Sequence, residues 1–296
     1  AARFARRQGL DIAIDLGGHT RGCRPGLFAR RVAPLQLGWL GFPGTSGAPF
    51  IDGLLADRHV APPGHDADFI ERVIRLPHCY QPNDARRLIS AQHFTRAALE
   101  LPDEAFVFCC FNHPVKITPE VFGLWTRLLQ QVPGSVLWLL RDNAAAAANL
   151  GRAAQAHGID PRRLVFAPRW PLAEHLSRHA AADLFLDTWP YNAHTTASDA
   201  LWAGLPLLTR AGESFASRVA SSLVLTLDVP ELVARDARDY EAKALELARE
   251  PHKLAELRRR VAVGRRQSPL FDTAGFTRGL EAALLEEWSR HAQAPR

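Results

Sequence analysis

Short apolar runs alternate with amphipathic helical stretches along nearly the whole sequence, and this alternation constrains the fold more than any other feature. A strand buried on both faces of a parallel sheet reads as a short apolar run, and a helix returns the chain to the next strand. The pattern therefore predicts an α/β protein whose parallel sheets are covered by helices. In the first part of the chain it predicts strands at 11–16, 35–40 and 72–76 and a helix at 26–31.

The second part of the chain shows the pattern more regularly. Strands are predicted at 106–111, 135–140, 164–167, 184–187 and 206–209, with helices at 119–131, 144–157, 172–182, 195–203, 214–223, 236–249, 253–266 and 273–291. The turn-rich segment from Pro77 to Asp84 separates the two parts. We expect two Rossmann-like lobes, at 1–85 and 86–270, and a C-terminal helix at 271–296.

Composition excludes several classes of protein. The 296 residues are 47% hydrophobic and contain no apolar run near the roughly 20 residues of a membrane helix. The net charge is +5, but the basic residues are scattered and not interleaved with aromatic residues, which favours a solvated surface over a nucleic-acid site. Four cysteines without a CxxC pair and the lack of a secretory signal predict a reduced, cytoplasmic protein.

Polar and aromatic residues follow each predicted strand of the second lobe. In a doubly wound sheet, ligands bind beyond the carboxyl ends of the strands and at the starts of helices. The most informative loop leads from the strand at 184–187 into the helix at 195–203. His194, Thr195 and Thr196 stand at this helix start, where side-chain donors and helix amides attract a phosphate. Asp199, one turn later, can accept from ribose hydroxyls; the alternative is a pair of ordinary threonine caps.

Lys116 is the second candidate, since it is one of only three lysines and follows the first strand of the second lobe. Its ammonium could neutralise the charge that develops on a diphosphate leaving group, or it could be a solvated loop residue. The glycine-rich loop Gly41-Phe-Pro-Gly-Thr-Ser-Gly47 would let backbone approach a ligand but matches no phosphate-binding motif. The histidines show no metal-ligand spacing, so we expect no metal site.

Several long motifs in fixed order resemble the catalytic region of the O-GlcNAc transferases, the SPINDLY-like glycosyltransferases of the GT-B fold. They are the glycine-rich loop just given, Cys110-Phe-Asn-His-Pro-Val-Lys116, Val132-Pro-Gly-Ser-Val-Leu-Trp-Leu-Leu-Arg141, His194-Thr-Thr-Ala-Ser-Asp-Ala-Leu-Trp-Ala-Gly204, Gly212-Glu-Ser-Phe-Ala-Ser-Arg218 and Ser268-Pro-Leu-Phe271. The resemblance implies an inverting transfer of N-acetylglucosamine from UDP-GlcNAc to Ser or Thr hydroxyls of proteins. It also implies that the reaction needs neither metal nor cofactor.

The resemblance assigns roles to individual residues. It places Lys116 on the diphosphate as the catalytic cation and His194, Thr195 and Thr196 beside it, with Asp199 at the ribose. The uridine side would be formed by His175, Arg178 and Trp170, and the sugar and acceptor side by Thr20, Leu40 and Gly41. His113 falls among the UDP-binding positions, although animal members carry Gln there. They also carry Tyr where this chain has Val115 and Lys where it has Leu172, so recognition of UDP differs in detail.

The resemblance also implies partners. Tetratricopeptide repeats that bind acceptor proteins, and the first half of the N-terminal lobe, would precede this chain in a longer protein. The last helix would pack back onto the first lobe, and the nucleotide sugar would lie in the cleft. Three alternatives stay open: another acceptor, fucose in place of GlcNAc as in SPINDLY-type relatives, or a UDP-binding module with little transfer activity.

Overall fold

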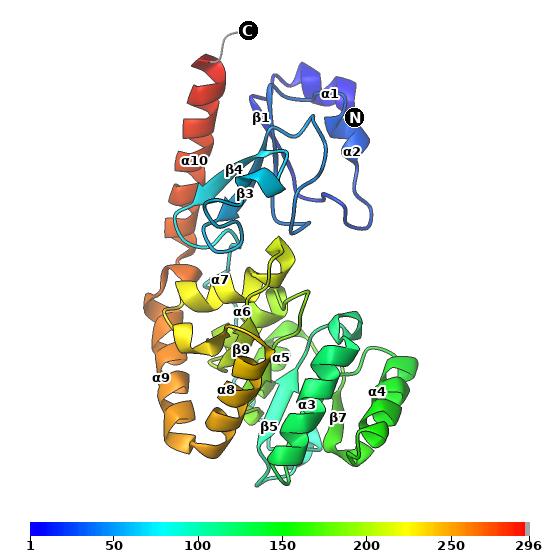
Figure 1. Cartoon of the computed structure of the whole chain (residues 1–296). Helices are drawn as coiled ribbons and strands as arrows, with labels where there is room; N and C mark the ends of the chain where they lie inside the picture. The colour runs from blue at the N-terminus through cyan, green and yellow to red at the C-terminus, as the bar shows by residue number, and fades with distance from the viewer. Residues whose placement is uncertain (294–296) are drawn as a thin grey trace. The chain divides into compact units, whose positions relative to one another are not determined.

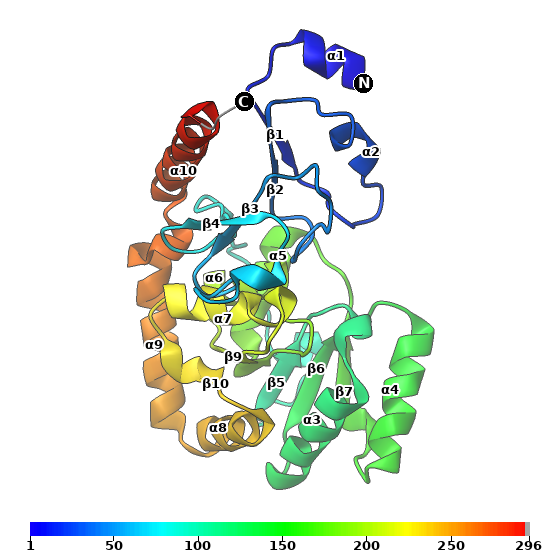
Figure 2. The ribbon, with the colours of Figure 1, turned by 45° about the horizontal axis from the view of Figure 1, so that its top comes forward.

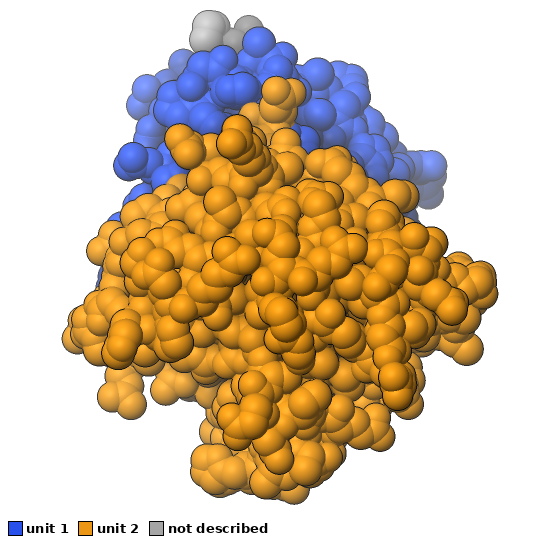
Figure 3. Space-filling view, turned by 60° about the horizontal axis from the view of Figure 1, so that its bottom comes forward, with its two compact units in different colours: residues 1–83, 214–216, 272–296 blue, residues 84–213, 217–271 orange. Residues whose placement is uncertain are grey.

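The computed structural model describes residues 1–293 of the chain (Figure 1). Within these residues, no helix is both long and apolar enough to cross a membrane. The chain forms two compact units, coloured separately in Figure 3. Unit 1 consists of Ala1–Asn83, Ser214–Ala216 and Asp272–Arg296, and unit 2 of Asp84–Glu213 and Ser217–Phe271. Figure 2 shows the same ribbon from a second direction.

Unit 1 contains a four-stranded parallel sheet in the order β1-β2-β3-β4. The strands are β1 (Ile12–Asp15), β2 (Leu35–Gly38), β3 (Gly53–Asp57) and β4 (Arg72–Leu76), and two short helices, α1 (Ala2–Arg7) and α2 (Pro25–Phe28), belong to the same unit. Each strand pairs with the next in sequence, so the loops that follow β1 and β2 lie at one edge of the sheet.

Strand β3 was not predicted from the sequence. All five of its residues are buried, and it pairs with β2 on one side and β4 on the other. The stretch Gly-Leu-Leu-Ala-Asp has too few consecutive apolar residues to stand out, and it contains no β-branched residue. Its strand state therefore depends on two neighbouring strands that offer it hydrogen bonds.

The last helix, α10 (Thr273–Gln293), completes the core of unit 1. Phe276, Leu280 and Trp288 pack against a buried cluster formed by β2, β3 and β4. The Phe276 ring stacks on Trp39 with 6.0 Å between the ring centroids, and Glu287 forms an ion pair with Arg72 of β4. Helix α10 therefore packs on the first sheet, as the family resemblance implies.

Unit 2 contains a six-stranded parallel sheet in the order β10-β9-β8-β5-β6-β7. Its strands are β5 (Val107–Cys110), β6 (Val136–Leu140), β7 (Leu164–Ala167), β8 (Leu184–Leu186), β9 (Leu207–Arg210) and β10 (Val233–Ala234). The chain passes outward through β6 and β7 and then returns beside β5 to form β8. This reversal between β5 and β8 is a topological switch point, where ligands of doubly wound sheets bind. The two parallel α/β sheets confirm the predicted fold class.

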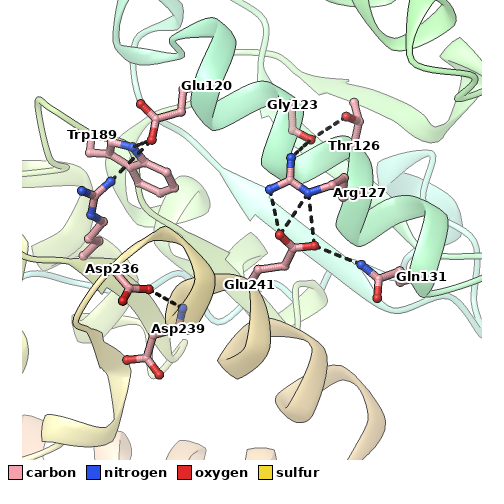
Figure 4. A network of polar contacts seen from close by, with 10 residues as sticks. Glu120, Gly123, Thr126, Arg127, Gln131, Trp189, Asp236, Asp239 and Glu241 are labelled. Atoms are coloured by element: carbon pink, nitrogen blue, oxygen red, sulfur yellow. Dashed lines mark hydrogen bonds and ion pairs between the residues drawn. The ribbon is translucent and has the colours of Figure 1, made fainter.

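Helices cover the sheet of unit 2. They are α3 (Pro119–Gln131), α4 (Ala144–Ala156), α5 (Leu172–Arg178), α6 (Thr195–Trp202), α7 (Val219–Thr226), α8 (Ala237–Arg249) and α9 (Pro251–Gln267). Side chains cap three of them, because Thr118, Asn143 and Asp236 each accept a hydrogen bond from a first-turn amide. Helix α8 packs beside α3, and Arg127 of α3 donates to both carboxylate oxygens of Glu241 (Figure 4).

Two predicted helices differ from the structure. The predicted helix at 214–223 is replaced by a 3₁₀ turn, Phe215–Ser217, followed by α7 from Val219 to Thr226, and its first residues belong to unit 1. The predicted helix at 172–182 ends as α5 at Arg178 and continues as a 3₁₀ turn through Ala181. The two-residue strand β10 was also missed, because so short a segment has no periodicity.

Candidate functional site

The loops after the strands of unit 2 gather at the carboxyl edge of its sheet, as the sequence predicts, because all six strands are parallel. The loop after β5 carries His113 and Lys116 in a 3₁₀ turn, Pro114–Lys116. The loop after β8 leads from Asp187 into α6. These two loops meet in the structure, because β5 and β8 are neighbours in the sheet.

Lys116 is fixed against the loop that precedes α6. Its Nζ donates to the carbonyl oxygen of Asn192 at 2.7 Å and lies 4.2 Å from the ring centroid of Tyr191. Burial lowers the pKa of the ammonium, while the nearby Asp187 carboxylate opposes this shift. The lysine side chain is therefore held in a fixed position at this sheet edge.

The start of α6 differs in one detail from the prediction. The prediction that Thr195 and Thr196 cap the helix is wrong: they are its first two residues, and His194 is the N-cap residue without a side-chain capping bond. The Thr196 hydroxyl instead donates to the Asn112 side chain, because Asn112 at the end of β5 lies opposite this turn. Thr195 is exposed, and the His194 ring stacks on Tyr191 at 4.9 Å between centroids.

A buried carboxylate that the sequence analysis missed organises this loop. Asp187 is fully buried and accepts from the amides of Thr188 and Ala193 at 2.7 and 2.6 Å and from the hydroxyl of Thr209 at 2.7 Å. Burial raises its pKa to about 6, against the effect of these hydrogen bonds. The only sequence signal was an Asp directly after an apolar strand.

The same loop is held from the other side by α3. Trp189 donates its indole N–H to Glu120 Oε1 at 2.9 Å (Figure 4). The guanidinium of Arg210 lies 5.4 Å from the Trp189 ring centroid. Inside the loop, the Asn192 amide donates to the Thr188 carbonyl at 2.8 Å. The backbone carbonyl that holds Lys116 therefore belongs to a rigid turn.

Asp199 is buried at 7% exposure on α6, one turn beyond the helix start. Its Oδ1 accepts from Arg87 Nη1 at 2.6 Å, a partner that the sequence analysis did not identify. Burial raises the pKa of Asp199, and the Arg87 charge opposes this shift. The predicted ribose-binding carboxylate thus has one oxygen engaged by an arginine 112 positions earlier in the chain.

The predicted uridine-side residues form a cluster on and around α5. Arg178 donates to His175 Nδ1 and to the Pro168 carbonyl, both at 2.6 Å, and its guanidinium lies 5.1 Å from the Trp170 ring centroid. An arginine has no acceptor, so His175 Nδ1 must be the accepting nitrogen and the proton of the neutral ring is on Nε2. Burial lowers the pKa of His175 to about 2. A pocket of about 150 Å³ adjoins this cluster, with Trp138, Trp170 and Arg178 in its lining.

The His113 ring contacts its own turn and the loop after β6. Its Nδ1 accepts from the Val115 amide at 3.2 Å, and its Nε2 lies 3.4 Å from Asp142, which also pairs with Arg169. The ring is exposed and joins the loops after β5, β6 and β7. The His113 carbonyl oxygen accepts from the Lys116 amide at 3.0 Å, so His113 and Lys116 belong to the same turn at the sheet edge, which agrees with a binding role.

Thr20, Leu40 and Gly41 lie in unit 1, in the loops after β1 and β2. Leu40 has a positive φ of +68°, and a Cβ on Gly41 would stand 2.0 Å from the Leu16 carbonyl oxygen, so only glycine fits there. The Thr20 hydroxyl donates to the Gly17 carbonyl at 2.7 Å. The two loops therefore interlock.

Glu71, another residue that the sequence analysis missed, anchors the glycine-rich loop of unit 1. This buried carboxylate accepts from the Thr45 hydroxyl at 2.6 Å and from the Ser46 amide at 2.5 Å, and the Ser46 hydroxyl adds a further bond. Burial opposes ionisation, but these hydrogen bonds hold the pKa of Glu71 below its ordinary value.

A match to a family model identifies the family of this chain. The model for "Glycosyl transferase family 41" matches residues 1–94 and 89–280. The chain belongs to glycosyl transferase family 41. Of the motif residues quoted from the sequence, Lys116 and the start of α6 lie at the carboxyl edge of the sheet of unit 2, and Gly41 lies in the loop after β2 of unit 1.

Individual proteins similar to this family 41 chain support the same family assignment. It is 37% identical, over 98% of its length, to a probable UDP-N-acetylglucosamine–peptide N-acetylglucosaminyltransferase SEC of Arabidopsis thaliana, and covers 30% of that protein. It is 33% identical, over 97% of its length, to the SPINDLY protein of Petunia hybrida with the same enzyme description, and covers 31% of it. The chain thus spans about a third of the length of these relatives.

A solved structure shows the same fold. The O-GlcNAc transferase of Thermobaculum terrenum superposes on 99% of this family 41 chain with a TM-score of 0.90 at 34% identity, and the chain covers 55% of it. The GT-B fold expected from the sequence is thereby confirmed. Among residues 1–293, no group of three or more His, Cys, Asp or Glu side chains is placed to hold a metal ion.

Proposed function

We propose that this family 41 chain carries the donor-binding machinery for an inverting, metal-independent transfer of N-acetylglucosamine from UDP-GlcNAc to Ser or Thr hydroxyls of proteins. The observation that carries the proposal is the position of Lys116, whose ammonium is fixed 2.7 Å from the Asn192 carbonyl beside the start of α6. A cation held at this point is suited to a diphosphate leaving group. The names of the relatives, which describe UDP-GlcNAc-dependent peptide transferases, support the same donor and acceptor.

Charge on the leaving group dictates what the site must supply. When the bond between sugar and diphosphate breaks, negative charge grows on the phosphate oxygens, and preorganised donors stabilise it by about 3 kcal/mol each. Lys116 would contribute a full positive charge. The first turn of α6, which begins at Thr195, would add its amides, the positive end of the helix dipole and the Thr195 hydroxyl.

The proposed base side contains a neutral imidazole. Because Arg178 fixes the proton of His175 on Nε2, the imidazole offers one donor and a flat face without a positive charge. Such a ring suits a nucleobase, which stacks on flat rings and accepts hydrogen bonds at its carbonyl oxygens. Trp170 holds the loop in place through its contact with Phe94 at 4.7 Å between centroids.

The remaining features of the proposal come from the family. They are the sugar and acceptor roles of Thr20, Leu40 and Gly41, the UDP contact of His113, the upstream tetratricopeptide repeats and remaining N-terminal lobe, and the absence of a cofactor requirement. The proposed cytoplasmic location rests instead on the cysteine pattern of the sequence. The alternatives are fucose as the donor sugar, a different acceptor, or UDP binding without transfer, and the first requires the same assay with a nucleotide-linked fucose as a second donor.

The test replaces Lys116 with Ala and measures transfer of radiolabelled GlcNAc from UDP-GlcNAc to protein acceptors by the full-length enzyme. We expect loss of transfer by at least about 100-fold, as for removal of one transition-state donor, with the melting temperature retained. Lys243→Ala is the matched control, because Lys243 bonds the Glu231 carbonyl far along the chain and should be unaffected.

Other outcomes would change the proposal. Full activity of the Lys116→Ala variant would remove Lys116 from the mechanism. UDP binding by the wild-type protein without any transfer would indicate a binding module. Labelling only from a nucleotide-linked fucose would correct the donor sugar.

A further inference from the structure

Arg87 and Asp199 form a buried ion pair inside unit 2. The distance between Arg87 Nη1 and Asp199 Oδ1 is 2.6 Å, and the two side chains are 12% and 9% exposed. Removing two charges from water costs nearly as much as their attraction returns, so such a pair is weak evidence for stability. Its position one turn beyond the start of α6 calls for another explanation.

The segment that carries Arg87 is fastened to two helices. The Ser90 amide donates to the Ala173 carbonyl of α5 at 3.0 Å, and the Ser177 hydroxyl of α5 donates to the Gln92 carbonyl at 2.6 Å. The indole N–H of Trp202, in the last turn of α6, donates to the Arg87 carbonyl at 3.2 Å. The backbone of Arg87 is therefore held between the two helices that carry His175 and Asp199.

The guanidinium itself is also held in place. It lies 5.3 Å from the Trp202 ring centroid, and its Nε donates to the Asp84 carbonyl at 3.2 Å. Only one of its terminal nitrogens is used, because Nη2 is buried and has no partner among the described residues. Among the described residues, the Asp199 carboxylate accepts a side-chain hydrogen bond from Arg87 alone. This bond goes to Oδ1, so Oδ2 has no donor.

We propose that Arg87 is a positioning residue that presents Asp199 Oδ2 to the ribose hydroxyls of the bound nucleotide diphosphate, so that the pair selects ribonucleotides. This inference rests on the proposed function, which places a nucleotide here. A ribose hydroxyl is a donor and can bond Oδ2, the carboxylate oxygen that Arg87 leaves free.

The charge of Arg87 has a second effect on the same carboxylate. Burial raises the pKa of Asp199, and the arginine charge and hydrogen bond counteract this rise. Without Arg87, a buried carboxylate would favour its protonated form, which is a poorer acceptor. Removing the guanidinium should therefore weaken ribose recognition by Asp199, even without any direct contact between Arg87 and the sugar nucleotide.

The test compares UDP with 2′,3′-dideoxy-UDP by isothermal titration calorimetry. The wild-type protein should bind the dideoxy compound at least about tenfold more weakly, the factor for one hydrogen bond to a charged group. Arg87→Met keeps the apolar stem over Trp202 but loses the guanidinium. We expect it to bind UDP about tenfold more weakly than wild type and to distinguish the two compounds less than about twofold.

Arg265→Met is the matched control. The Arg265 guanidinium also lies over the Trp202 ring, at 5.4 Å, and donates to the Trp202 carbonyl at 3.1 Å, but it makes no bond to Asp199 in the described structure. Its replacement should leave both affinities within about twofold of wild type. If Arg87→Met does not fold by its melting curve, Arg87→Lys replaces it, and discrimination should fall about threefold.

Three outcomes would overturn the inference. A variant at Arg87 that discriminates as well as wild type would show that the pair does not serve the ribose. Tighter binding of UDP by the variant would show that Arg87 competes with the nucleotide. Equal binding of UDP and 2′,3′-dideoxy-UDP by the wild-type protein would show that the ribose hydroxyls are not recognised. A wild-type protein that does not bind UDP at all would overturn the proposed function itself.

Discussion

Asp187 shows how a single residue determines the geometry of the site. Its two carboxylate oxygens bond the amides at both ends of the turn, Thr188 and Ala193, and the hydroxyl of Thr209 on the neighbouring strand. The turn between these amides carries the Asn192 carbonyl that fixes Lys116. Asp187 therefore acts on the proposed leaving-group cation through the backbone, without touching a ligand.

Replacing Asp187 with Ala should leave two buried amides without acceptors, at a cost of about 1–3 kcal/mol each. We expect the free energy of unfolding to fall by roughly 2–5 kcal/mol in urea titrations, and transfer activity to fall because Lys116 loses its support. Asp187→Asn keeps an acceptor oxygen of the same shape and should lose less than about 1.5 kcal/mol. Equal losses for the two variants would contradict the proposed role of the acceptor oxygen.

The pH dependence of Asp187 has a definite sign. Its pKa in the folded protein, about 6, lies above the ordinary aspartate value, so its contribution to stability is present below about pH 4 and is lost as pH rises through 6. Between pH 4 and 6 the wild-type protein should therefore lose stability relative to Asp187→Asn. Unfolding titrations of both proteins at several pH values measure this difference directly.

Helix α5 shows how one element combines several groups. Its residues His175, Arg178 and His179 bond one another: Arg178 donates to His175 Nδ1, and His179 Nδ1 donates to the His175 carbonyl at 2.7 Å. The two imidazoles therefore hold their protons on opposite nitrogens. Burial, followed by smaller effects of neighbouring groups, lowers the pKa of His175 to about 2 and that of His179 to about 4.

Acid should destabilise unit 2 through these two histidines. In the unfolded chain they bind protons near pH 6.5, so stability is present above that pH and is lost as pH falls, with a limiting slope of about 1.4 kcal/mol per pH unit for each. His179→Asn retains a donor to the His175 carbonyl but does not titrate in this range. The loss of unfolding free energy between pH 7 and 5 should be about 1–2 kcal/mol smaller in this variant; an unchanged loss would contradict it.

At the scale of the whole molecule, the last helix belongs to the core of the first sheet. Helix α10 follows unit 2 in the chain, yet it packs on β4, and Leu280 contacts the cluster of Leu35, Leu37, Leu55, Ile74 and Leu76. The two ends of the chain are therefore parts of one unit. A change late in the sequence should destabilise strands formed near its beginning.

Leu280→Ala should lower the stability of unit 1 by about 1–3 kcal/mol, since this half-buried side chain loses part of the burial energy of a core leucine. Hydrogen–deuterium exchange should then accelerate in β2, β3 and β4 while β5 and β6 stay protected. Leu285→Ala on the same helix is the control, because Leu285 is 68% exposed and should change neither. Equal exchange in β4 for both variants would show that α10 does not support the sheet.

The sequence by itself determined the parts of this protein that depend on local pattern. Apolar runs and helical periodicity were sufficient for five strands of unit 2 and for the bounds of α3, because neighbouring residues create those signals. The order of strands and loops also placed Lys116 and the start of α6 at one sheet edge. The family motifs then supplied the roles of individual residues, which remain predictions.

Only the tertiary structure decided the pairings between distant residues. The bond between Arg87 and Asp199 spans 112 positions, the contact of Lys116 with Asn192 spans 76, and Glu71 reaches back 25 or 26 positions to the glycine-rich loop. Strand β3 likewise formed because β2 and β4 lie on either side of it. The sequence pattern does not reveal such partners, because they come together only when the sheets assemble. Burial and hydrogen bonding between them exist only from that stage.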